Sequence, residues 1–130
     1  MANPEHLPIL AKGVAAWNEW REGRFGEIAV DLTGAPLMNA ELAHVNFAEV
    51  NLEMAELAGA KLRSSRLSST FLRGANLAGA DLWKARMSGA TLTGANLERA
   101  NLIQANLTGA DLHHVSLPSV PILMRQFPRS

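Results

Sequence analysis

The chain has 130 residues, its 12 basic residues balance 12 acidic ones, and it contains no cysteine. The lack of cysteine excludes a disulfide framework and a thiolate metal site. No apolar run approaches the roughly 18 residues of a membrane-spanning helix, and the N-terminus lacks the charged-then-apolar layout of a secretory signal, so we expect a cytoplasmic protein.

The first predicted element is an amphipathic α-helix within residues 7–22. Leu10, Val14 and Trp17 fall on one face of such a helix, as in a helix that buries one side. Acidic side chains accompany the basic ones along it, which disfavours the alternative of a helix anchored to an anionic membrane surface. We therefore expect residues 1–29 to form an N-terminal helical cap and a linker.

A strict repeat follows, because every fifth residue in 32–117 is large and apolar. Eighteen positions keep this phase, and all are Leu except Phe47 and Met87. A second column, two residues earlier in each unit, is mostly Ala or Val, with Ser65 and Thr70 as its polar members. A helix needs apolar contacts every three to four residues and a half-buried strand every two, so a period of five indicates a unit that turns a corner once per repeat. Both columns are predicted to point inward.

The unit Ala-(Asp/Asn)-Leu-x-x, as in residues 75–79 and 100–104, resembles the pentapeptide-repeat family. The resemblance implies an all-β solenoid, a right-handed quadrilateral β-helix with four pentapeptides per coil and coils spaced by roughly 4.8 Å. Residues 30–119 then form about 4.5 coils, in which residues twenty apart stack on one side. The string AAWNEWR at residues 15–21 also resembles a lead-in found in many bacterial, notably cyanobacterial, members.

The repeat is predicted to end in a C-terminal cap or tail at residues 120–130. Pro118, Pro121 and Pro128 interrupt strand pairing, and Arg125 stands where a small inward residue belongs. The tail has enough apolar residues to cover the last coil. It could equally pair with a second copy, because the resemblance implies that such proteins often dimerise through their terminal coils.

Catalytic and metal-binding motifs are weak. His113 and His114 lie near Asp111, but adjacent histidines in a turn diverge and no third nitrogen or sulfur ligand is evident. The chain has no Gly-rich phosphate loop between strand and helix, and no Ser-His-acid set that the repeat brings together. A column with a packed interior also offers no cleft. We expect no enzymatic activity, no metal and no cofactor.

Charge is distributed unevenly along the chain. Residues 27–56 carry acidic side chains and no Lys or Arg, whereas residues 61–99 are mainly basic. The twenty-residue register gathers part of the basic set on two adjoining sides, as a candidate basic patch of Lys61, Arg63, Arg66, Lys84 and Arg86. It is either a solvated surface or a phosphate or nucleic-acid site. Nucleic acid is disfavoured, because the total charge is balanced and only Trp83 is near for stacking.

A candidate protein-interaction surface lies beside this patch. Trp83, Ile103 and Leu123 each follow an inward position on one side of the column and are predicted to point outward as an apolar ladder. Contiguous exposed apolar surface is uncommon without a partner. The alternatives are that the C-terminal tail folds over the ladder, that the residues are scattered surface apolars, or that the ladder mediates self-association.

Two functions from different classes fit these features. The first is a non-catalytic protein-binding or scaffold module that presents a rigid β-helical surface. The second comes from the family resemblance, since some members mimic duplex DNA and inhibit DNA gyrase, protecting it from quinolones. That mimicry needs a long acidic rod, whereas here only the first third of the column is acidic and the middle is basic. The sequence therefore favours the binding module.

Overall fold

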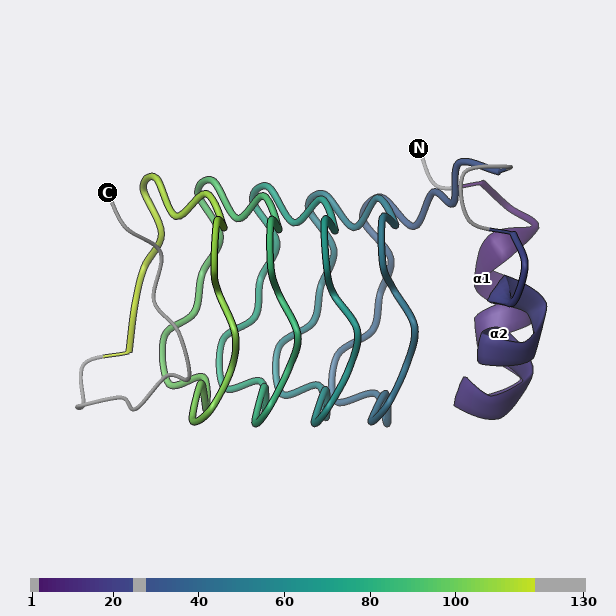
Figure 1. Cartoon of the computed structure of the whole chain (residues 1–130), viewed down its shortest axis with the longest axis horizontal. Coiled ribbons are helices and arrows are strands. Elements are labelled where there is room, and N and C mark those ends of the chain that lie inside the picture. The colour runs from purple at the N-terminus through teal and green to yellow at the C-terminus, as the bar shows by residue number, and fades with distance from the viewer. Residues whose placement is uncertain (1–2, 25–27, 119–130) are drawn as a thin grey trace.

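The computed structural model describes residues 3–24 and 28–118 as a four-sided parallel β-helix with two short helices at its N-terminal end (Figure 1). Helix α1 spans His6–Leu10 and helix α2 spans Val14–Arg21. Neither of these described helices has the length and apolar character that crossing a membrane requires.

The single helix expected within residues 7–22 is wrong in one respect, because the structure breaks it in two. Gly13 lies between α1 and α2 with a φ of 110°, a backbone angle that no α-helix contains. The turn folds α2 back against α1, and the two helices contact each other. Trp17 and Leu10 still become buried, as the amphipathic pattern predicts.

The β-helix has a register of twenty residues. Parallel bridges join residue pairs twenty apart, from Asp31 with Asn51 to Asn96 with Ser116. Each bridge is isolated, so every side of a coil is a minimal strand between two turns. The backbone ladder is regular: Leu32 N donates to Asn51 O at 2.7 Å, and Asn51 N donates to Val30 O at 2.9 Å. We number the sides one to four in chain order, beginning with those of Leu32, Leu37, Leu42 and Phe47.

The core consists of the two predicted columns. Phe47 and Met87 replace Leu without a change of phase, and both are fully buried. The polar members of the small column are inside as well, since Ser65 and Thr70 have no exposed surface. At the last described coil the burial decreases, and Leu117 is 41% exposed.

The corners require a left-handed backbone once per unit. The residue two places after each inward Leu has a positive φ, from 56° at Lys84 to 71° at Gly94. Glycine adopts this region at little cost, and other residues do so less readily. At Gly74 a second reason applies, because the Met54 sulfur of the preceding coil occupies the space that a Cβ would fill. The corner residue is therefore often, but not always, glycine.

The N-terminal helices satisfy the open backbone edge of the first coil. Trp17 Nε1 donates to Asn46 O at 2.8 Å, and Asn18 Oδ1 accepts from Asn46 N at 2.7 Å. Arg21, which is 2% exposed, donates from Nη2 to Ala48 O at 2.7 Å. Among the described residues no coil precedes these groups, and a buried unpaired backbone group is costly. The side chains of α2 thus replace a missing strand on side four.

Sides one and two of the first coil are closed in other ways. His6 Nδ1 accepts from Asp31 N at 3.1 Å, and Asn3 N donates to Asp31 O at 3.1 Å. Pro36 occupies the corresponding bridge position on side two, where it has no N–H to leave unpaired. Proline at a sheet edge also discourages pairing with a foreign strand. The capped end is therefore a poor template for strand addition.

Candidate protein-interaction surface

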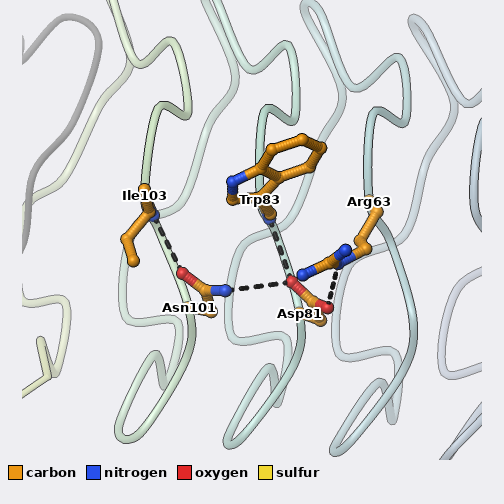
Figure 2. A network of polar contacts seen from close by, with 5 residues as sticks. All are labelled: Arg63, Asp81, Trp83, Asn101 and Ile103. Carbon is orange, nitrogen blue, oxygen red and sulfur yellow. Dashed lines mark hydrogen bonds and ion pairs between the residues drawn. The ribbon is translucent and has the colours of Figure 1, made fainter.

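The corner between sides three and four holds the most distinctive surface of the column. Arg63, Trp83 and Ile103 follow one another on successive coils, each one residue after an inward Leu (Figure 2). The Arg63 Cζ lies 4.9 Å from the centre of a Trp83 ring, and Lys84 Nζ lies 4.5 Å from it. Both distances are within the range of cation–π attraction. The indole thus lies within reach of two cations.

A polar network holds the Arg63 side chain and the backbone N–H groups of Trp83 and Ile103 (Figure 2). Asp81 accepts a charge-assisted hydrogen bond from Arg63 Nε at 2.6 Å, and its other oxygen accepts from Trp83 N at 3.2 Å. Asn101 Nδ2 donates to Asp81 at 3.3 Å, and its own oxygen accepts from Ile103 N at 3.1 Å. The network links three coils. It orients Arg63 toward the indole before any partner arrives.

The predicted apolar ladder is present in part. Ile103 is 43% exposed, and Trp83 on the preceding coil is half-buried. Trp83 is less exposed than the sequence pattern suggested, because Arg63 and Lys84 both lie close to its rings. Leu123 lies outside the described residues. The surface is therefore a mixed aromatic, aliphatic and cationic one rather than a purely apolar strip.

The five residues of the candidate basic patch lie together, as the register requires. Arg66 and Arg86 form a bridge pair on side four, and Lys61 bridges Asp81 on side three. All five basic side chains are exposed. Asp81 offsets one of these charges through its ion pair with Arg63. We call the basic patch together with Trp83 and Ile103 the basic corner.

Comparison with known proteins identifies the repeat. The family model for pentapeptide repeats matches residues 28–63, 55–94 and 85–119, with 8 copies of the repeat. The chain belongs to the pentapeptide-repeat family. No curated protein matches the sequence.

Two solved structures of pentapeptide repeat proteins resemble the column. The chain is 36% identical to Rfr23 from the cyanobacterium Cyanothece 51142, with a TM-score of 0.63, and the match covers 82% of this chain and 68% of that one. It is 31% identical to alr5209 from Nostoc PCC 7120, with a TM-score of 0.56 and coverage of 90% and 86%. These likenesses confirm the predicted right-handed quadrilateral β-helix.

The pentapeptide-repeat register also divides charge between opposite sides of the column. Sides three and four, with their corners, carry five basic and three acidic residues: Lys61, Arg63, Arg66, Lys84, Arg86, Glu41, Glu49 and Asp81. Sides one and two carry two basic and five acidic residues: Arg73, Arg99, Asp31, Glu53, Glu56, Glu98 and Asp111. The uneven charge along the chain is visible in the sequence, whereas this division across the column emerges only when each charge is assigned to a side.

A second surface, which the sequence pattern did not predict, follows from that division. Glu53 and Met54 lie at the corner between sides one and two, with Phe71 on side one and Glu56 on side two. Met54 is 61% exposed and Phe71 is 47% exposed. Arg73 Nε lies 3.9 Å from Glu53 and offsets part of its charge. We call Glu53, Met54, Glu56 and Phe71 the acidic corner, which is diagonally opposite the basic corner.

Other polar features of the described chain do not form a catalytic site. Asp111 accepts hydrogen bonds from the backbone and the ring of His113, which hold its pKa below the ordinary value. The described residues contain no group of three His, Cys, Asp or Glu that could hold a metal ion. A hollow of about 310 Å³ lies between α2 and side four, and its lining is Asn18, Glu22, Gly23, Asn46 and Arg66. That lining has no nucleophile paired with a base.

Proposed function

We propose that this pentapeptide-repeat protein is a non-catalytic, cytoplasmic binding module that presents its basic corner to a protein partner. The observation that carries the proposal is the exposed Ile103 on the coil after Trp83, with the cationic groups of Arg63 and Lys84 close to the indole. Tryptophan and arginine are the residue types that most often dominate the energetics of protein interfaces. A corner that holds both on adjacent coils suits protein recognition.

Rigidity supports the same proposal. The inward columns are almost fully buried, and each coil is hydrogen-bonded to the next through its backbone. Asp81 also holds Arg63 in position before binding. A preorganised surface loses less conformational entropy on association than a flexible one, so more of the contact energy appears as affinity.

A role directed at DNA gyrase has weaker support. Mimicry of duplex DNA requires negative charge along the whole length of the rod. Here the basic corner occupies the middle coils, and the acidic residues are concentrated on the opposite sides. We therefore expect no inhibition of gyrase supercoiling by stoichiometric amounts of this protein. Inhibition at that ratio would favour the gyrase role over the proposed one.

Affinity capture tests the proposal when it is run as a matched comparison. The bait is the full chain, and the test variant carries Trp83→Glu and Ile103→Glu. The control carries Met38→Glu, which introduces a charge at a side chain that is 60% exposed and lies on a different corner. Thermal unfolding of all three proteins verifies that they are folded.

The proposal expects a partner that the wild type and the control retain and the double variant loses. Direct titration of that purified partner must then show the same order of affinities. A set of captured proteins that is identical for all three baits would overturn the proposal.

A further inference from the structure

The division of charge across the column specifies a partner for the basic corner. We propose that this corner docks onto the acidic corner of a second copy of the chain, side by side. The proposal rests on the proposed function in using the same corner, and it deepens that function by assigning the partner.

Electrostatic complementarity is the first argument. Lys84 and Arg86 on the basic corner are exposed, and so is Glu56 on the acidic corner. The chain has no net charge at neutral pH, so two copies do not repel each other at long range. Each copy instead carries an excess of positive charge on two sides and of negative charge on the other two. Such an arrangement favours an approach in which unlike sides face each other.

Apolar complementarity is the second argument. The basic corner presents Ile103 and part of the Trp83 indole, and the acidic corner presents Met54 and Phe71. Methionine sulfur makes favourable contacts with aromatic rings, and aromatic pairs attract one another beyond their buried area. Each corner thus combines exposed apolar side chains with charged ones, which are the two components of an interface core and rim.

The position of the corners determines the kind of assembly. They are diagonally opposite, so one copy can use both corners at once with two different neighbours. Such a contact is heterologous and does not close on itself, and it produces open rows rather than dimers. Met54 lies one coil nearer the N-terminus than Trp83. Two parallel copies therefore meet with a shift of one coil, roughly 4.8 Å along the axis.

The contact is expected to be weak and sensitive to salt. Arg73 partly neutralises Glu53 on the acidic corner, and Asp81 partly neutralises Arg63 on the basic corner. Exposed ion pairs contribute little each and are screened by ions. We therefore expect average size to increase with protein concentration between about 10 μM and about 1 mM. The increase is expected at about 20 mM salt and should largely disappear at about 500 mM salt.

A charge-swap experiment tests the contact by sedimentation velocity on the full chain. One variant carries Glu53→Lys and Glu56→Lys, so both of its corners are basic. The other carries Lys84→Glu and Arg86→Glu, so its basic corner loses its positive excess, because the two new Glu and Asp81 balance Lys61, Arg63 and Arg66. Each variant alone is expected to associate at least about tenfold more weakly than the wild type, because neither variant can pair a basic corner with an acidic one. An equimolar mixture is expected to recover association, since basic corners again meet acidic ones.

Two control variants change the net charge by the same amount at other places. Glu5→Lys with Glu19→Lys matches the first variant, and Lys12→Glu with Arg99→Glu matches the second; all four side chains are exposed and lie off both corners. Both controls are expected to associate as the wild type does. Recovery in the mixture also excludes misfolding as the reason for the loss in each variant alone.

The possible results separate this inference from the proposed function. A wild type that stays monomeric over the whole range of concentration and salt overturns the second-copy proposal, while the capture experiment remains a test of the basic corner. Association that survives Glu53→Lys with Glu56→Lys also overturns it, because self-association would then not use the acidic corner. Loss in both variants without recovery in the mixture contradicts the pairing of the two corners.

Discussion

Two polar residues of the small inward column show how much a single hydroxyl depends on its neighbours. The Thr70 hydroxyl donates to Phe47 O at 2.7 Å in the buried interior. The Ser65 hydroxyl is equally buried, yet it has no hydrogen-bond partner among residues 3–24 and 28–118. A buried polar group without a partner loses its hydration and gains nothing in return.

The two positions therefore respond in opposite directions to the loss of the hydroxyl. We expect Ser65→Ala to raise the free energy of unfolding by about 1 kcal/mol, because Ala is the residue that the column ordinarily carries. Thr70→Val should lower it by about 1 kcal/mol, since it removes a made hydrogen bond at nearly constant volume. Urea unfolding followed by circular dichroism measures both. A Ser65→Ala variant less stable than the wild type would contradict this explanation.

A local turn on the first coil gives a pH-dependent contribution to stability. The Thr33 hydroxyl and backbone N–H both donate to Asp31 Oδ1, at 2.6 Å and 2.9 Å, and they lower the pKa of that carboxyl. Because the pKa of this carboxyl is lower in the folded state, its ionised form stabilises the fold at pH values above its ordinary pKa of about 3.9. That contribution is lost as the pH falls through the lower, folded-state pKa.

Thr33→Val removes the larger of these two causes. We expect the pKa of Asp31 in the folded protein to rise toward its ordinary value, while the backbone hydrogen bond keeps part of the shift. Carboxyl ¹³C NMR titration of the variant and the wild type measures the change. An Asp31 pKa that is the same in both proteins would show that the hydroxyl does not hold the carboxylate.

At the scale of elements, helix α2 serves as a substitute strand for the first coil. Its predicted amphipathic face is buried, and Trp17 packs edge-on against Phe47 with ring centres 5.6 Å apart. The sequence pattern identified the buried face of the helix. It could not identify the hydrogen bonds from Trp17, Asn18 and Arg21 to the coil edge, because these depend on how the helix lies across the column.

The capping role predicts a local effect of Trp17→Phe. The variant keeps an aromatic ring but removes the Nε1 donor, leaving Asn46 O buried at a cost of about 1–3 kcal/mol. Hydrogen exchange should accelerate at the amides of Asn46 and Phe47, while the amide of Leu77, two coils further on, changes little. Trp20→Phe serves as the control, because Trp20 contacts Trp17 but lies half outside the core. Uniform acceleration along the column would argue against a local cap.

At the scale of the whole molecule, the five-residue period determines which features of the fold could be predicted from the sequence. It predicted both inward columns, including Phe47 and Met87, because a period is independent of the residues between. It missed the break at Gly13, since glycine within a short helical segment permits either a helix or a turn. It did not reveal the acidic corner, because Met54 and Phe71 are placed on adjoining parts of the column only when every outward position is assigned to a side.

The exposure of Trp83 is another feature that the period predicts only in part. Its outward direction followed from the repeat, but its half-buried state depends on the rotamers of Arg63 and Lys84. Those rotamers depend in turn on Asp81 and on the corner geometry at Lys84, where φ is 56°. Side-chain contacts between coils depend on the three-dimensional structure, and the five-residue period of the sequence does not predict them.

Photo-cross-linking from position 103 in living cells is the most direct test of the central claim that the basic corner binds protein. A benzoyl-phenylalanine replaces Ile103 in one protein and Met38, which lies on a different corner, in the control. The account predicts discrete adducts from position 103 that Trp83→Glu abolishes, with an adduct of twice the chain mass if the partner is a second copy. No adduct from position 103, or the same adducts from both positions, would contradict it.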